Sequence, residues 1–313
     1  ENELKQEGWL NKIFSILTDQ SNYDFSPYKT NTLQRRIDRR MVLRQINTYK
    51  EYIDYLQHNS DEIETLFKEL LIGVTSFFRD HEPFDILAKK GLSETFEQMP
   101  EHSYFRVWVP GCSTGEEIYS LAMILHEYRE HTSKQVYLQL FGTDINKEAI
   151  EKARAGVYPA SIVADVGEER LEKFFTEEGN YYRIKDEIRE TVVFSVQNIL
   201  KDPPFSRLNL LSCRNLLIYF KPETQKKLLP LFHYALNPNG ILMLGSSEST
   251  GEFTRFYETL DKKWKIFSRK EVPITLRHRI DFPSEPTFQE HEKKQPAPAP
   301  KKPQTKDFVQ ITQ

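Results

Sequence analysis

The chain has 313 residues, of which 38% are hydrophobic and 28% are charged, and its formal net charge is -3. This composition allows a buried core in one large domain or two modest ones, and it excludes a general electrostatic attraction to nucleic acid. The two cysteines, Cys112 and Cys213, stand far apart and predict neither a zinc site nor a disulfide framework. We therefore expect no metal and a reducing, cytoplasmic setting.

The ends of the chain carry no targeting signal. No apolar run approaches the roughly 20 residues that span a bilayer, and no signal peptide is present, so we expect no insertion into a membrane. The chain begins at Glu1 without a methionine, which predicts a fragment of a longer protein.

Residues 1–85 have a helical pattern. Leu33, Ile37 and Met41 recur four residues apart, and more apolar groups with helical spacing follow between residues 52 and 71. No strand pattern interrupts them. We predict a small all-helical domain here.

Residues 86–272 alternate between strand and helix patterns. The expected strands cover residues 106–109, 136–141, 191–196, 208–212, 241–244 and 265–268, and the expected helices cover residues 118–129, 146–155 and 222–236. This alternation predicts a doubly wound, Rossmann-like α/β sheet. Residues 157–190 are polar and interrupt it, so we expect an insertion with short strands. Residues 273–313 lose the periodicity, and their proline- and lysine-rich part predicts a disordered linker or tail.

A loop with two glycines, Gly111 and Gly115, and two carboxylates, Glu116 and Glu117, follows the first expected strand. In an open α/β sheet, ligands bind at the carboxyl ends of the strands, and glycines let the backbone approach them closely. The spacing differs from the G-x-G-x-x-G of dinucleotide-binding loops, and carboxylates would repel a pyrophosphate. They suit a cationic ligand, such as the sulfonium and amino group of S-adenosylmethionine.

Asp144 ends the next expected strand, where an acid commonly binds the ribose hydroxyls of an adenosine. Ordinary helix capping and compensation of the helix dipole are the alternative for Glu116, Glu117 and Asp144. The loop and the acid together favour an adenosine-containing ligand, although neither would do so alone.

Three ordered blocks of sequence resemble the signature motifs of the CheR-type chemotaxis receptor methyltransferases. They are Thr75-Ser76-Phe77-Phe78-Arg79-Asp80, Ser113-Thr114-Gly115-Glu116-Glu117 and Cys213-Arg214-Asn215-Leu216-Leu217-Ile218-Tyr219-Phe220. The resemblance covers residues 5–270. Residues 201–207 and 231–238 are most similar to members that are fused to a methylesterase and to sensor domains. The resemblance implies a protein-glutamate O-methyltransferase that uses S-adenosylmethionine to esterify glutamate side chains of a chemoreceptor in sensory adaptation.

The resemblance also implies roles for individual residues. Arg79 and Tyr219 match positions at the site of methyl transfer, and Arg79 also matches a cofactor contact. Glu117 and Asp144 match the residues that hold the amino-acid part and the ribose of the cofactor. The other predicted cofactor contacts, in the loop and the matching blocks, are Thr75, Gly111, Ser113, Gly115, Asn198, Ile199, Cys213, Arg214 and Asn215. At position 73 many relatives carry an asparagine that touches the cofactor, so Gly73 predicts weaker binding.

Two other functions are considered. Asp202-Pro203-Pro204-Phe205 resembles a motif of nucleic-acid amino-methyltransferases, but there the motif directly follows a strand, whereas here it precedes the strand at residues 208–212. A non-catalytic module that senses S-adenosylmethionine in a signalling fusion is the second alternative, which Gly73 keeps open. The presence of Arg79 and Tyr219 argues against it.

Two surfaces are candidates for contact with a receptor. Arg36, Arg40 and Arg44 lie four residues apart, and the resemblance implies that they contact the acidic methylation helices of the receptor. A solvated face with local ion pairs is the alternative.

The second surface is the insertion, residues 157–190, where the family has a small β-subdomain. Some members bind the C-terminal peptide of the receptor there through a glycine-rich loop. Here Gly179-Asn180 has one glycine and predicts a simple hairpin turn, and Glu177 and Glu178 would repel an acidic peptide. We expect no such tether, and fusion to other signalling domains would raise the local concentration instead.

Overall fold

The computed structural model describes residues 2–132 and 134–272. The predicted linker, residues 273–313, lies outside the described residues. Within the described part of the chain, no helix combines the length and the hydropathy that crossing a membrane requires.

The N-terminal part of the chain is built from four helices. They are α1 (Asn2–Ser21), α2 (Thr30–Leu43), α3 (Tyr49–His58) and α4 (Ser60–Leu70). The apolar stripe of α2 is buried, with Leu33 and Ile37 at 1% and 0% exposure. The helical spacing of these residues therefore produces one core-facing side of the helix, as the sequence predicts.

The structure differs from the expected all-helical domain at residues 71–81, which form no helix. Phe78 and Asp80 have positive φ angles of 46° and 63°, which a right-handed helix does not allow. The segment connects α4 to α5 (Glu82–Ile86) without regular structure and includes a turn at residues 77–80, and a π-helical turn (Leu87–Gly91) and α6 (Leu92–Gln98) follow.

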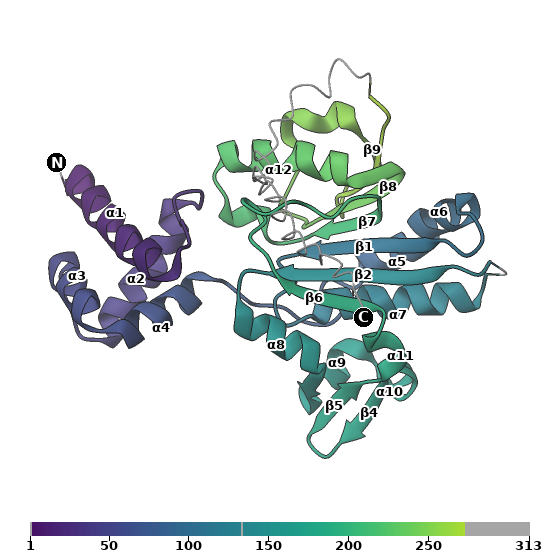
Figure 1. The fold of residues 1–313 in the computed structure, drawn as a ribbon, viewed down its shortest axis with the longest axis horizontal. Helices are drawn as coiled ribbons and strands as arrows, with labels where there is room; N and C mark the ends of the chain where they lie inside the picture. The colour runs from purple at the N-terminus through teal and green to yellow at the C-terminus, as the bar shows by residue number, and fades with distance from the viewer. Residues whose placement is uncertain (1, 133, 273–313) are drawn as a thin grey trace, which may run out of the picture. The chain divides into compact units, whose positions relative to one another are not determined.

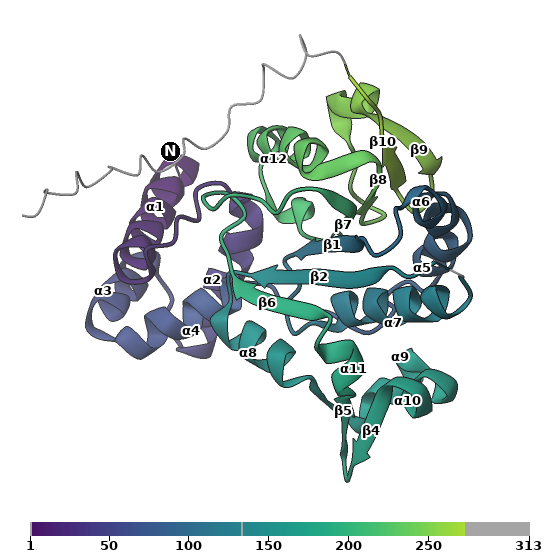
Figure 2. The ribbon, with the colours of Figure 1, turned by 45° about the vertical axis from the view of Figure 1, so that its right-hand side comes forward.

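A seven-stranded sheet forms the centre of the second part (Figures 1 and 2). Its order is β6-β2-β1-β7-β8-β10-β9, and the five strands from β6 to β8 are parallel. The strands are β1 (Tyr104–Pro110), β2 (Tyr137–Asp144), β6 (Val192–Val196), β7 (Leu208–Cys213), β8 (Leu236–Leu244), β9 (Tyr257–Asp261) and β10 (Ile266–Arg269). The predicted strands are all present, whereas β9 was not predicted.

The alternation of side chains divides the core between the two faces of this sheet. Val107 of β1 belongs to the face covered by α7 (Glu116–Glu130), whereas its neighbour Trp108 belongs to the face covered by α12 (Pro222–Ala235). Both residues are 0% exposed. A parallel strand with both faces covered must be apolar throughout, which explains the continuous apolar run in this strand.

The insertion forms a small sheet of its own, in the order β3-β5-β4 (Figure 1). After α8 (Lys147–Ala155), which belongs to the main α/β alternation, the elements of the insertion are β3 (Val157–Pro159), a 3₁₀ turn (Ala160–Ile162), α9 (Val163–Val166), α10 (Glu168–Phe174), β4 (Phe175–Glu178), β5 (Tyr181–Ile184) and α11 (Asp186–Arg189). Gly179 and Asn180 connect β4 to β5 as a two-residue turn, in which Gly179 has a φ angle of 63°. The hairpin predicted for these two residues is therefore present.

Candidate functional site

A cavity lies at the carboxyl ends of the parallel strands, where the strand order reverses at β1. It measures about 1060 Å³ including its open mouth. The segments that follow four strands line it: residues 111–113 after β1, 144–146 at the end of β2, 197–199 after β6 and 214–216 after β7. In doubly wound sheets, this reversal point is where ligands bind.

Most residues that were predicted to hold the cofactor line this cavity. They are Thr75, Arg79, Gly111, Ser113, Glu117, Asp144, Asn198, Ile199, Arg214 and Asn215, and Tyr219 lines it as well. Gly115 and Cys213 do not. Gly115 precedes α7 with a φ angle of 96°, and Cys213 ends β7 with 0% exposure because its side chain points into the core on the α12 face.

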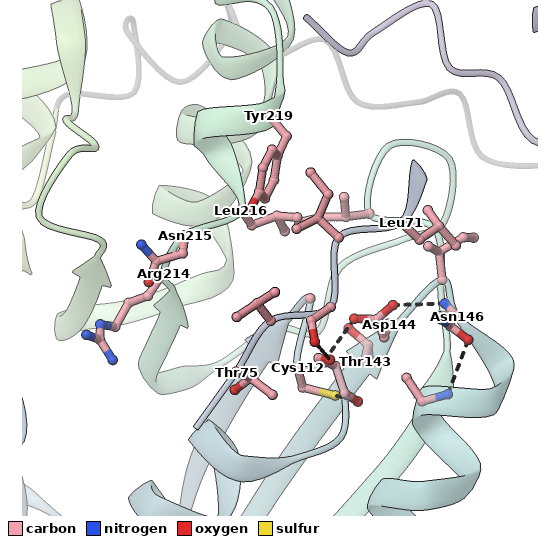
Figure 3. A pocket seen from close by; sticks show the side chains of 18 of the residues that line it. Leu71, Thr75, Cys112, Thr143, Asp144, Asn146, Arg214, Asn215, Leu216 and Tyr219 are labelled. Atoms are coloured by element: carbon pink, nitrogen blue, oxygen red, sulfur yellow. Dashed lines mark hydrogen bonds between the residues drawn. The ribbon is translucent and has the colours of Figure 1, made fainter. Parts of the chain in front are cut away.

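Asp144 connects the loops at the ends of β1 and β2. Its Oδ2 accepts a hydrogen bond from the backbone N–H of Ser113, and its Oδ1 accepts one from the backbone N–H of Asn146, both at 2.8 Å (Figure 3). Asn146 in turn caps α8, since its side chain accepts from the N–H of Ala149 at 3.2 Å. Burial raises the pKa of Asp144, while these backbone N–H groups oppose the shift. Each carboxylate oxygen keeps a lone pair for a hydroxyl donor in the cavity.

Glu117 lies in the first turn of α7 and is held by residues at the end of β7 and directly after it. Ser212 donates its hydroxyl to one carboxylate oxygen at 2.8 Å, and Arg214 contacts the other at 3.3 Å. Burial raises the pKa of Glu117, and Arg214 and Ser212 oppose this. Of the two carboxylates in the loop, only Glu117 lines the cavity, since Glu116 is occupied by the hydroxyl of Thr114 at 2.8 Å.

The guanidinium of Arg214 is held by contacts within the protein, so its charge is not available to a ligand in the cavity. Its guanidinium is 1% exposed and bonds Asp80 at 3.0 Å and the carbonyl oxygen of Arg79 at 2.9 Å, besides Glu117. In Figure 3 this guanidinium points away from Tyr219 and Asp144. The acidic groups that face the cavity, Glu117 and Asp144, therefore keep it suited to a cation, which fits the sulfonium and ammonium of S-adenosylmethionine.

The segment with Thr75 and Arg79 is fixed by its two phenylalanines. Phe77 packs edge-on against Tyr158 of β3, with 4.8 Å between the ring centroids. The guanidinium carbon of Arg170 lies 4.3 Å from the ring centroid of Phe78. The hydroxyl of Tyr158 also donates to the carbonyl oxygen of Thr114 at 2.7 Å. The inserted subdomain thus braces both cofactor segments. The side chain of Arg79 stays half-buried and bonds the carbonyl oxygen of Val74 at 3.1 Å.

Tyr219 belongs to a short 3₁₀ helix (Leu217–Tyr219) and lies against the cavity opposite Asp144 (Figure 3). Its carbonyl oxygen accepts the N–H of Lys29 at 2.8 Å, and the next residue, Phe220, packs against Tyr28 at 4.8 Å. The N-terminal helices therefore help to fix the backbone beneath Tyr219.

Tyr23 and Tyr28, which were not predicted as site residues, also line the cavity. Their hydroxyls share a hydrogen bond of 2.5 Å. Burial raises the pKa of Tyr28 to about 12, so the pair stays neutral near pH 7. Helical periodicity marks apolar faces only, and both tyrosines lie in the connection between α1 and α2, so no signal in the sequence identified them.

Gly73 lies beside the glycine loop. Its carbonyl oxygen accepts the hydroxyl of Ser113 at 3.3 Å, and a Cβ atom at position 73 would stand 3.0 Å from that hydroxyl oxygen. The glycine therefore permits a close approach of the two segments, which a larger residue would have to loosen.

The structure corrects the docking hypothesis at Arg40. This side chain is 7% exposed, and its guanidinium bonds Glu62 at 2.7 Å and Glu69 at 3.0 Å. Arg44 is partly exposed but also bonds Glu62, at 2.7 Å. Arg36 is half-buried, and among the described residues no ion pair involves it. The spacing of four residues placed these arginines on one side of α2, but it could not show that Glu62 of α4 faces them.

The motif at residues 202–205 has a structural role. The carboxylate of Asp202 accepts the N–H of Asn198 at 2.7 Å, and Phe205 stacks on Phe141 at 4.2 Å. The motif precedes β7, as the sequence indicates, and Asp202 does not line the cavity. Its resemblance to nucleic-acid methyltransferases is therefore not matched by its position.

Comparison with known proteins follows the same division. Residues 73–266 match the model of the CheR methyltransferase, SAM binding domain, and residues 9–71 match that of the CheR methyltransferase, all-alpha domain. A chemotaxis protein methyltransferase of Borreliella burgdorferi is 28% identical over 77% of this chain and 87% of its own length. The corresponding protein of Salmonella typhimurium is 29% identical over 78% of this chain and 84% of its own length.

A longer relative is also similar. An uncharacterized 104.1 kDa protein of Rhodobacter capsulatus is 41% identical over 86% of this chain, which spans only 28% of that protein. The comparisons confirm the predicted resemblance, the fold class and S-adenosylmethionine as the cofactor of the larger domain. The chain belongs to the CheR methyltransferase family, as a S-adenosylmethionine-dependent methyltransferase domain preceded by the all-helical domain of that family.

Proposed function

We propose that this chain esterifies glutamate side chains on the cytoplasmic helical domain of a chemoreceptor, within a larger signalling protein that adds methylesterase and sensor domains. The observation that carries the proposal is the meeting of two sets of residues at one cavity. Glu117 and Asp144 suit a cationic methyl donor, and Arg79 and Tyr219 line the same cavity. S-adenosylmethionine supplies the methyl group when it is bound.

The reaction requires little acid–base catalysis by the protein. A glutamate side chain is ionised near pH 7, so its oxygen attacks the methyl carbon without a general base. The carbon–oxygen bond forms as the carbon–sulfur bond breaks, and the bonding pair stays on the sulfur. The residues of this chain have to align the anion and exclude water, which supplies several kcal/mol of barrier lowering.

Arg79 and Tyr219 are suited to that task. The cationic Arg79 orients the incoming carboxylate, and the hydroxyl of Tyr219 offers it a hydrogen bond. A salt bridge that is too tight would stabilise the substrate more than the transition state. In the part of the chain that the structure describes, the guanidinium of Arg79 donates one hydrogen bond, to the carbonyl oxygen of Val74, which leaves most of its donors for the substrate.

The direct test is incubation with tritiated S-adenosylmethionine and membranes of the source cell. We expect label on a receptor-sized band that mild base releases as methanol, since methyl esters are base-labile. An Asp144→Ala variant should give a much weaker band at a limiting concentration of S-adenosylmethionine. Label that nuclease removes would favour the nucleic-acid alternative. Cofactor binding without any transfer would favour the sensor module.

A further inference from the structure

A buried carboxylate outside the cofactor loops has no part in the reaction as described so far. Glu248 follows β8 and is 5% exposed. Its Oε2 accepts the backbone N–H of Gly245 at 2.6 Å and that of Asn215 at 3.1 Å, and its Oε1 accepts that of Ile218 at 3.2 Å. Within residues 2–132 and 134–272, no ion pair involves this carboxylate.

The segment that Glu248 holds carries residues of the cavity wall. It runs from Arg214 to Tyr219, and Asn215 and Tyr219 line the cavity. Glu248 bonds this segment twice, at Asn215 directly after β7 and at Ile218 inside the 3₁₀ helix that presents Tyr219. Asn215 has a φ angle of 58°, a strained conformation that needs support from its surroundings.

The approach of the two loops is close enough to require a glycine. A Cβ atom at Gly245 would stand 2.9 Å from the backbone nitrogen of Asn215 and 2.9 Å from Oε2 of Glu248. The backbone at Gly245 has no positive φ angle, so this contact is what excludes a side chain. The Gly245 position is therefore an independent sign that the spacing between Glu248 and Asn215 is fixed.

We propose that Glu248 is a positioning residue for methyl transfer, which holds Asn215 and Tyr219 in place through the backbone of residues 215–218. The proposal rests on the proposed function, because that function assigns Tyr219 to the reaction. An ionised carboxylate accepts hydrogen bonds only, so it matches three converging N–H donors. Glutamine has a similar shape, but its NH₂ group would point at one of these backbone N–H groups. Two hydrogen-bond donors would then face each other without an acceptor.

The negative charge of Glu248 contributes to raising the pKa of Glu117 and of Cys213. In the described part of the chain, neither side chain forms a hydrogen bond with Glu248. The backbone donors are therefore the contacts that a substitution at Glu248 removes, and the segment 214–219 is the part of the site that should respond.

The experiment compares Glu248→Gln with Glu252→Gln, a matched change of an exposed carboxylate on the turn that follows. Three properties of the full chain are measured: kcat with receptor membranes, the Kd of S-adenosylhomocysteine by calorimetry, and amide hydrogen exchange in residues 213–220. For Glu248→Gln we expect kcat to fall about tenfold or more, Kd to change less than about threefold, and exchange to accelerate. Glu252→Gln should leave all three unchanged.

A second variant keeps the proposal testable if Glu248→Gln fails to fold. Gly245→Ala keeps the residue Glu248 but crowds both its carboxylate and the backbone nitrogen of Asn215, so it should reproduce the slower kcat and the faster exchange. Unchanged exchange in both variants would overturn the proposal, as would equal losses in kcat and cofactor affinity. If the unmodified chain transfers no methyl group, the proposed function fails, while the exchange measurement still decides whether Glu248 holds this segment.

Discussion

The carboxylate of Asp144 accepts the backbone N–H of Ser113 at 2.8 Å, so the acid at the end of β2 also fixes the glycine loop after β1. The two predicted cofactor elements are thus one unit. A change at Asp144 should affect both the ribose contact that we predict for it and the shape of the loop after β1.

Asp144→Ala should therefore weaken binding of S-adenosylmethionine and S-adenosylhomocysteine by at least about tenfold in calorimetry, because charge-assisted hydrogen bonds are lost on both sides. Asp144→Asn is the matched control, since its amide oxygen can still accept from Ser113. We expect the cofactor affinity of Asp144→Asn to lie between those of the unmodified chain and the alanine variant. Unchanged affinity in the alanine variant would remove Asp144 from the site.

Cofactor affinity should also depend on pH through Glu117. The carboxylate must be ionised to attract a cation, and burial raises its pKa above the ordinary range. Affinity should accordingly decrease as the pH falls through that raised pKa, in a titration from about pH 8 to pH 5. Glu117→Gln should bind more weakly at pH 8 and show a shallower pH dependence. The pKa of Asp144 is raised as well, so some dependence should remain. An identical slope in the glutamine variant would contradict this role of Glu117.

Catalysis should separate from binding at Arg79 and Tyr219. Arg79→Ala and Tyr219→Phe should each lower kcat by about tenfold or more, with smaller changes in the Kd of the cofactor. Tyr181→Phe, a matched change of an exposed tyrosine on β5, should have no effect. If Tyr219→Phe keeps full turnover, its ring only packs against the cavity.

Receptor docking is expected at Arg36 rather than at Arg40. Charge reversal of Arg36 should raise the KM for receptor, most clearly at low salt, with little loss of stability. Charge reversal of Arg40 should instead destabilise the fold by about 3–5 kcal/mol, because Glu62 would stay buried without its main partner. Thermal unfolding and KM measurements at two salt concentrations separate the effects. An unchanged KM for the Arg36 variant at low salt would support a merely solvated face.

The positions of these residues in the structure show which features the sequence could predict. Asp144 and Glu117 were predictable because loops that follow parallel strands converge at one edge of the sheet. The burial of Arg40 was not, because its partner Glu62 lies 22 residues away on another helix. Glu248 was missed for the same reason, since it lies 33 residues beyond Asn215. Spacing along one element does not reveal which side chain of another element faces it.

The insertion gives the last prediction: the β4–β5 hairpin should not bind the C-terminal peptide of a receptor. Gly179 and Asn180 form a two-residue turn, and a Cβ atom at Gly179 would meet nothing within 4 Å, so the glycine serves the positive φ angle and no close backbone contact. β-Strand addition uses a free sheet edge, which β4 has in the order β3-β5-β4, so the expectation rests on the turn. This tight turn offers no glycine-rich loop to receive the peptide backbone.

Electrostatics contributes less to this expectation than the sequence indicates. Glu178 forms a two-point ion pair with Arg183, at 2.6 and 2.9 Å, so only Glu177 keeps an uncompensated negative charge among the two acids. The contacts of Tyr158 with Phe77 and Thr114 give the subdomain a different task, the support of the cofactor segments.

Titration of labelled receptor tail peptides by fluorescence anisotropy tests whether the hairpin binds such a peptide. We expect no saturable binding up to high micromolar concentrations of the chain. We also expect none with Arg183→Ala, because releasing Glu178 from its ion pair only adds negative charge. Tyr158→Phe should weaken binding of S-adenosylhomocysteine by a few-fold, since it removes one partly buried hydrogen bond to the loop after β1. Saturable micromolar binding of a peptide that is lost on changing Gly179 or Asn180 would show that the hairpin is a receptor tether after all.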